Sequence, residues 1–224
     1  MKTVFLGEVL NVIPVDNGLV FSHVLEKTEE EIQVAYKMIT FSDGKTTPVP
    51  KSLYHLSKFG ANYRAVLPHT QNIILSKTLQ ISNEKTFLLN PDGSALIINN
   101  SGEVLWEGII KYRDNAPAAI ALNNRSIWAC FKQSSVLMRL NLATMREELR
   151  IGSGSSSPFN KPEDLFIDGD FIYVCDAADN AIIKLNLNTY VTEVYKKFDS
   201  PIKQFVINEG FPLVILEEGI FLLD

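Results

Sequence analysis

The chain has 224 residues, of which 46% are hydrophobic, and a net charge of −5 with acidic and basic residues interspersed. This balance excludes a basic patch for nucleic acid and a polybasic segment for a membrane surface. No apolar run reaches the roughly 18 residues of a membrane-spanning helix, and Glu8 follows the first apolar residues too soon for a signal-peptide core. The sequence therefore predicts a cytoplasmic protein that binds neither nucleic acid nor membranes.

Short strands separated by turns are predicted throughout the first half of the chain. Residues 1–7 have no hairpin partner close by, and the Pro-Val-Pro sequence at 48–50 suits an edge strand, because each proline removes a ladder donor. Between residues 52 and 110 we find five candidate strands where a four-stranded unit needs four. Strands in this half are predicted at 10–15, 19–25, 32–41, 63–67, 72–79, 86–89, 95–99 and 103–108.

A four-stranded meander is clearest between residues 152 and 196. Asp168-Gly169 is a strong hairpin signal between the apolar runs 165–167 and 171–175. Residues 181–187 then alternate apolar and polar side chains, as in a half-exposed strand, and residues 192–196 supply a fourth, more polar strand. This arrangement is typical of one blade of a β-propeller.

The same stretch resembles the NHL repeat, a propeller-blade unit. The shared pattern is Phe-Asn-x-Pro, a short apolar strand, Asp-Gly, Ile-Tyr-Val-x-Asp, a polar turn with Asn, and Ile-x-Lys. Its residues here are Phe159, Asn160, Pro162, Asp168, Gly169, Ile172, Tyr173, Val174, Asp176, Asn180, Ile183 and Lys184. The resemblance implies the blade fold for residues 152–187 and implies little about function, since one fold hosts many functions.

An internal repeat extends the blade pattern to neighbouring segments. A shift of 45 residues superposes 117–122 on 162–167, 127–130 on 172–175 and 139–144 on 184–189 without a gap. A shortened third copy begins at Pro201 and lacks its outer strand, which residues 1–7 can supply.

We therefore expect a single domain, residues 1–224, folded as an all-β propeller of five blades with four antiparallel strands each. In this arrangement the N-terminal strand closes the last blade. Units of about 37 residues would instead give six blades, which is the alternative.

The repeat also predicts where a ligand would bind. In propellers, the loops that enter the first strand of each blade and those that join the second and third strands form one face of the disc. The candidates for this face are charged and mainly acidic: Glu163, Asp164, Asp176, Asn180, Phe131, Lys132, Lys203 and Glu217. The sequence assigns no catalytic residue among them.

A metal site has little support among these residues. Glu163 and Asp164 begin an inner strand, where carboxylates could hold a hard cation such as calcium, but the preceding repeat has two alanines there. We therefore interpret Glu163 and Asp164 as solvated loop residues, and Asp176 and Asn180 as residues that stabilise a turn. We expect no cofactor, with a divalent cation such as calcium as the alternative.

Other reactive groups also have structural interpretations. Cys130 and Cys175 occupy the same repeat position in neighbouring blades, whose sheets pack about 10 Å apart, whereas a disulfide needs Cα atoms within about 7 Å. We expect two buried free thiols. The three histidines lack the spacing of zinc ligands, and the Gly-Ser-rich run at 152–157 lacks the Gly-Lys-Ser/Thr ending of a phosphate loop.

Two classes of function remain. Because blade packing accounts for nearly all of the patterning, the preferred prediction is a non-catalytic binding module or scaffold that recognises a protein, peptide or small ligand on the disc face. The alternative is a propeller enzyme, either a metal-dependent hydrolase of the lactonase type or a lyase, with its site at the channel mouth. The sequence leaves the oligomeric state open.

Overall fold

The structure, a computed structural model, describes residues 1–41, 44–51, 62–66, 77–82 and 84–223. These residues form antiparallel strands, one 3₁₀ turn at Gly154–Ser156 and no α-helix. None of them forms a helix long and apolar enough to cross a membrane. The chain divides into two compact units, unit 1 with residues 1–71 and 203–224 and unit 2 with residues 72–202.

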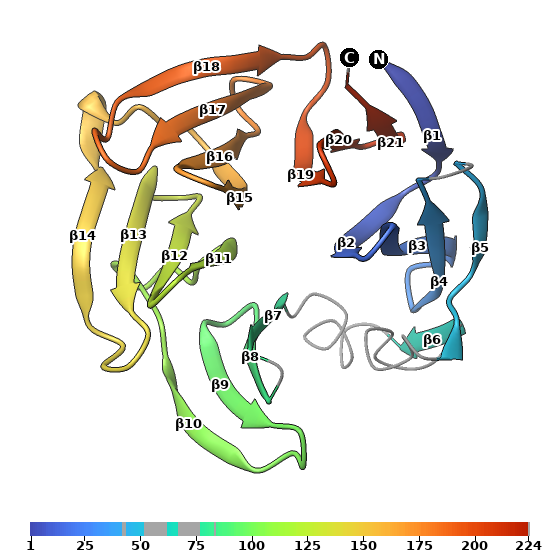
Figure 1. The fold of residues 1–224 in the computed structure, drawn as a ribbon, viewed down its shortest axis with the longest axis horizontal. Coiled ribbons are helices and arrows are strands. Elements are labelled where there is room, and N and C mark those ends of the chain that lie inside the picture. Colours follow the sequence, from blue (N-terminus) through green and yellow to red (C-terminus); the bar gives the residue numbers. More distant parts are fainter. Residues whose placement is uncertain (42–43, 52–61, 67–76, 83, 224) are drawn as a thin grey trace. The chain divides into compact units, whose positions relative to one another are not determined.

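Unit 1 contains two sheets (Figure 1). The first has the order β2-β3-β4-β5, with β6 also pairing with β4, and the second has the order β1-β21-β20-β19. The strands are β1 (Lys2–Leu6), β2 (Val9–Val15), β3 (Gly18–Lys27), β4 (Glu31–Thr40), β5 (Thr46–Pro48), β6 (Asn62–Val66), β19 (Ile202–Asn208), β20 (Phe211–Leu216) and β21 (Gly219–Leu222).

Unit 2 contains three sheets, each a meander of four consecutive strands. They are β7 (Lys77–Ser82), β8 (Lys85–Leu89), β9 (Ser94–Asn99) and β10 (Val104–Ile109); β11 (Ala119–Asn123), β12 (Ser126–Phe131), β13 (Val136–Asn141) and β14 (Glu147–Gly152); and β15 (Pro162–Asp168), β16 (Phe171–Asp176), β17 (Ala181–Asn186) and β18 (Thr192–Lys197). We call the five sheets blades 1 to 5, in the order in which their first strands β2, β7, β11, β15 and β19 occur.

These sheets confirm the all-β prediction and give five blades in the described residues rather than six. The N-terminal strand completes the last blade as predicted, because β1 pairs with β21 from Lys2 opposite Leu222 to Leu6 opposite Gly219. Gly219 has φ +155, and a Cβ there would collide with the carbonyl oxygen of Phe5, so glycine is required for this pairing. The predicted single domain stays a prediction, since the chain divides into two units.

The surplus strand between residues 52 and 110 belongs to blade 1. The long strand β4 has two partners along one edge, since Glu31–Ala35 pairs with β6 and Lys37–Ile39 pairs with β5. The predicted strand at 72–79 is partly outside the described residues, and β7 begins at Lys77. The first part of this predicted strand, residues 72–76, lies outside the described residues.

Blades 3 and 4 repeat each other at an offset of 45 residues. Strands β12, β13 and β14 match β16, β17 and β18 in both their first and last residues. The turns repeat as well: the side-chain oxygens of Asn141 and Asn186 each accept two backbone N–H groups, and Met145 and Tyr190 both adopt a left-handed φ near +57°. Asparagine favours such turns because its side chain satisfies backbone donors locally.

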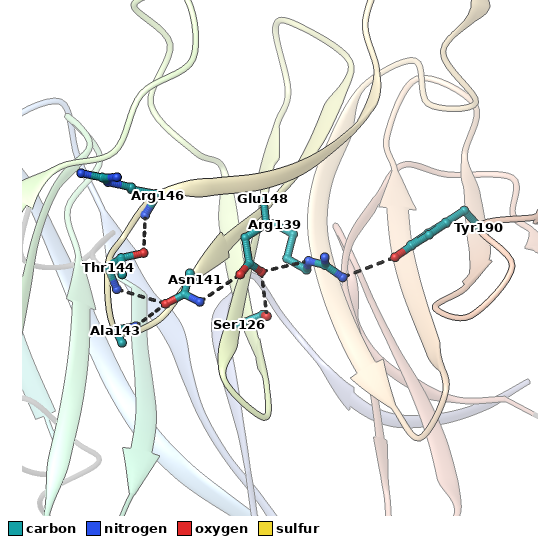
Figure 2. A network of polar contacts seen from close by, with 8 residues as sticks. All are labelled: Ser126, Arg139, Asn141, Ala143, Thr144, Arg146, Glu148 and Tyr190. Atoms are coloured by element: carbon teal, nitrogen blue, oxygen red, sulfur yellow. Dashed lines mark hydrogen bonds and ion pairs between the residues drawn. The ribbon is translucent and has the colours of Figure 1, made fainter.

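Apolar clusters fill the spaces between neighbouring blades in unit 2. One cluster joins blades 2 and 3, with Phe87 and Phe131 fully buried, and another joins blades 3 and 4, with Trp128 and Ile172 buried. Around the second cluster, a polar network crosses between the blades (Figure 2). In it, Arg139 pairs with Glu148 at 3.2 Å and donates to the Tyr190 hydroxyl at 3.3 Å.

The two blades of unit 1 are joined by side chains of β19 that bind the backbone of β2 and of the first residue of β3. The Gln204 amide accepts from Val12 N–H at 3.1 Å and donates to the Val12 carbonyl at 3.2 Å. The Asn208 amide donates to the carbonyls of Val15 and Gly18 at 3.0 and 2.5 Å. Side-chain amides in β19 thus bond to backbone groups about 190 positions away in the chain and join the two blades.

Candidate functional site

The candidate residues of unit 2 gather where the first strands of its blades begin, which we call the leading end. Figure 1 shows β11 between β7 and β15, in agreement with the contacts that β11 makes with both strands. Lys77 is the first residue of β7, and Glu163 and Asp164 are the second and third residues of β15. Lys132 directly follows β12, and antiparallel pairing returns the end of β12 to the start of β11.

An ion pair joins blades 3 and 4 at the leading end. The Lys132 ammonium lies 2.6 Å from one carboxylate oxygen of Glu163 and 2.5 Å from the other. Both side chains are about one-third exposed, at 34% and 32%. Because solvent screens a pair of this exposure, we expect its net contribution to stability to stay below about 1 kcal/mol. Its partners can therefore be exchanged at little cost.

A second ion pair reaches from blade 2 to blade 4. The Lys77 ammonium lies 3.9 Å from the carboxylate of Asp164, whose side chain is only 7% exposed. Strand β11 lies between β7 and β15, and at its start the repeat has Ala118 and Ala119 in place of the two acids. Asp164 is thus a buried carboxylate with a cation beside it rather than the solvated loop residue that we predicted.

The cysteines lie directly under this charged layer. Cys175 is opposite Asp164 in the pairing of β15 with β16, and Cys130 is opposite Ala119 in the pairing of β11 with β12. Both are free and fully buried, which confirms the prediction. Burial, followed by the negative charge of Asp164, raises the pKa of both thiols well above the ordinary value. This opposes formation of the thiolate, which is the nucleophilic form of cysteine.

Asp176 is fully buried and holds a turn together. Its carboxylate accepts backbone N–H groups from Asn160 at 2.6 Å and Lys161 at 2.9 Å, which belong to the loop before β15. It also accepts from Ala178 at 3.2 Å and Asp179 at 3.4 Å, in the turn after β16. The carboxylate therefore connects two loops and is oriented away from any exposed ligand.

Asn180 and Phe131 also have structural positions. Asn180 adopts a left-handed φ of 48°, and its carbonyl accepts the N–H of Phe198 at 2.8 Å. Phe131 has no exposed surface and lies against Tyr112, with ring centroids 5.9 Å apart. A ligand on the surface cannot contact the Phe131 ring, so this residue belongs to the core rather than to a binding face.

The last two candidates, Lys203 and Glu217, belong to unit 1. Lys203 is half-buried in β19, and Glu217 is exposed in the turn between β20 and β21. The structure brings Glu163, Asp164 and Lys132 together in unit 2, and adds Lys77, which the sequence analysis missed. The predicted strand at 72–79 placed Lys77 near the end of a strand, whereas it begins one.

The described part of the chain contains no group of three His, Cys, Asp or Glu side chains that could hold a metal ion. At the leading end, the carboxylates of Glu163 and Asp164 each have a lysine as partner. The carboxylate of Asp176 accepts backbone N–H groups. Each of these three carboxylates therefore has an internal partner.

Neither a protein-family model nor a curated protein sequence matches this chain. Among solved structures, it is similar to the computationally designed protein Ika8, with a TM-score of 0.53 and 11% identity over 97% of this chain and 71% of the designed chain. It is also similar to a structure of streptogramin B lyase, with a TM-score of 0.55 and 14% identity over 96% of this chain and 65% of the lyase. Together with the five antiparallel sheets, these similarities show the fold class, a five-bladed β-propeller, and nothing about activity.

Proposed function

We propose that the protein is a non-catalytic binding module, and that the leading end of unit 2 recognises a protein or peptide segment with charged side chains of both signs. One observation carries the proposal: the three carboxylates there, Glu163, Asp164 and Asp176, already have internal partners. A general acid or base must reach a substrate proton, and a metal ligand must direct lone pairs to the ion. Recognition needs neither.

The exposure of the ion pairs supports a partner that exchanges them. Lys132 and Glu163 keep about one-third of their side-chain surface in water, and Lys77 keeps 29%. A lysine ammonium has three donors, so each lysine can bind an additional acceptor while its present partner stays close. Charged groups arranged in this way contribute selectivity and association rate more than affinity.

The proposal can be tested by exchanging the charges of one pair. The double variant Lys132→Glu/Glu163→Lys keeps the ion pair but reverses its direction, so the fold should be retained. We expect peptides selected on an array by the wild-type protein to lose at least about tenfold in affinity for this variant, measured by fluorescence anisotropy. The matched control is Lys184→Glu/Glu193→Lys, which reverses the 3.5 Å pair between β17 and β18. It should leave the affinity unchanged.

Equal affinity of all three proteins would contradict the proposal, as would an array on which no peptide binds.

The enzyme alternative makes a different prediction. A cation that binds only the native protein raises the unfolding temperature by mass action. Unfolding should therefore be the same with calcium and with a chelator if the binding module is correct. A calcium-dependent increase that Glu163→Gln abolishes would instead favour a metal-dependent enzyme.

A further inference from the structure

Unit 1 contains a groove with a volume of about 340 Å³. It shares no residue with the candidate site in unit 2. It lies between the sheet of blade 5 and the end of β4 in blade 1. Six of its nine described lining residues are apolar, but polar atoms make up about half of the exposed lining surface, and Lys2 is the charged residue among those described. The residues that line it are Lys2, Thr3, Val4, Ile39, Phe41, Gly44, Phe211, Leu213 and Leu222.

The pairing of strands in blade 5 aligns three of the residues that line the groove. Leu213 is opposite Leu222, and Leu222 is opposite Lys2, so the three residues form a row across β20, β21 and β1. Burial changes along this row, from Leu213 at 1% exposed through half-buried Leu222 to exposed Lys2. The row is therefore apolar at its inner end and carries its cation at the solvent end.

Two phenylalanines also line the groove. Phe41, directly after β4, and Phe211, the first residue of β20, have ring centroids 5.4 Å apart and planes tilted by 42°. Phe211 is 42% exposed, which leaves much of a large apolar ring in water. An aromatic ligand could contact this ring by an offset or edge-to-face arrangement, which aromatic pairs prefer.

We propose that this groove binds a small aromatic carboxylate. The ring system lies against Phe211 and half-buried Leu222, and the carboxylate pairs with the ammonium of Lys2. The volume is at the lower end of the roughly 300 to 1,000 Å³ typical of ligand sites, which suits a ligand with one or two fused rings. Lys2 is the charged residue among the described lining residues, and its cation favours an anion over an amine of the same shape. This site is independent of the function proposed for unit 2.

The test uses 2-naphthoate and its cationic counterpart, 2-naphthylmethylamine, as probes with the full chain. Fluorescence polarisation of 2-naphthoate should give a Kd on the order of 1 mM, as expected of a ligand this small. The amine should bind at least about fivefold more weakly, and added salt should weaken the binding of naphthoate.

Two variants locate the site. Phe211→Ala removes the exposed aromatic ring and should weaken naphthoate binding about tenfold. Lys2→Gln keeps a polar side chain but removes its charge, and should weaken naphthoate binding roughly two- to fivefold while the amine binds as well as before or better. Phe171→Ala is the matched control, because Phe171 is the first residue of β16, the equivalent position in blade 4, and has a lysine ammonium 4.0 Å from its ring centroid.

Weakening by Phe211→Ala and Lys2→Gln but not by Phe171→Ala supports the proposal. Undetectable binding of naphthoate at about 5 mM overturns it, as do equal affinities for naphthoate and the amine, or equal losses in Phe211→Ala and Phe171→Ala. Circular dichroism of each variant shows whether the fold is retained. If Phe211→Ala fails to fold, the Lys2→Gln result and the comparison of the two probes still decide the question.

Discussion

Replacing Asp176 should destabilise the protein more than replacing any other acidic residue of the same turn. In Asp176→Ala, the N–H groups of Asn160 and Lys161 lose a charged acceptor at 2.6 and 2.9 Å. Hydrogen bonds to charged groups contribute roughly 1.5 to 3 kcal/mol each. The longer bonds from Ala178 and Asp179 add less. We expect a loss of about 3 to 5 kcal/mol in the free energy of unfolding.

The isosteric variant Asp176→Asn gives a finer test. It keeps one acceptor oxygen but places an amide NH₂ opposite one of the two loop N–H groups that the carboxylate accepted. We expect a loss of roughly 2 to 3 kcal/mol, between that of the alanine variant and the wild type. The matched control is Asp179→Ala, in the same turn, since the Asp179 side chain accepts only one bond from the Asn160 amide at 3.5 Å. It should change the stability by less than about 0.5 kcal/mol.

Urea unfolding followed by circular dichroism measures these differences, and calorimetry provides a second measure. At this chain length 1 kcal/mol corresponds to about 2 to 4 °C, so Asp176→Ala should lower the unfolding temperature by roughly 6 to 20 °C. A loss below about 1 kcal/mol, or a loss equal to that of Asp179→Ala, would refute the argument that this carboxylate connects the two loops.

Three further predictions concern other parts of the chain. Gln204→Ala and Asn208→Ala should each lower the free energy of unfolding by about 1 to 2 kcal/mol in urea, because each removes hydrogen bonds to the backbone of β2. Burial lowers the pKa of His23 below its ordinary 6.5, because it disfavours the charged imidazole in the folded protein. The contribution of His23 to the free energy of unfolding should therefore be fully present above about pH 6.5 and be lost as the pH falls below it. In unfolding experiments between about pH 8 and 5, His23→Phe should remove this loss. The raised pKa values of Cys130 and Cys175 predict that a disulfide reagent labels neither thiol at pH 8 until denaturant is added, and rapid labelling of the native protein would contradict their burial.

Local chemistry made blades 3 and 4 predictable from the sequence. Their hairpins carry Asp-Gly and Asn-rich turns, and alternation of apolar residues identifies the strands between them. The Asn141 and Asn186 turns recur at the same offset as the strands, so sequence and structure repeat together. The N-terminal strand was predictable for another reason: a last blade with three strands needs a fourth.

Non-local pairing limited the rest of the prediction. The surplus strand β6 pairs with one half of β4 while β5 pairs with the other, and no turn signal connects β6 to β4 in the sequence. The Lys77–Asp164 pair joins strands on either side of β11, so its two residues are 87 positions apart in the chain and in blades that are not consecutive. Spacing within a repeat cannot reveal a contact of this kind.

Phe131 and Asp176 show why equivalence within a repeat did not identify function. They occupy the same position 45 residues apart, and both are fully buried, yet one packs against Tyr112 and the other binds backbone N–H groups. Both contacts connect the end of the second strand of a blade to the loop that precedes that blade. The difference between Phe131 and Asp176 therefore reflects two ways to stabilise a blade. The informative differences between repeats are instead those that introduce charge at the leading end. The step from two alanines in blade 3 to Glu163 and Asp164 in blade 4 is such a difference, because it creates both ion pairs of the leading end.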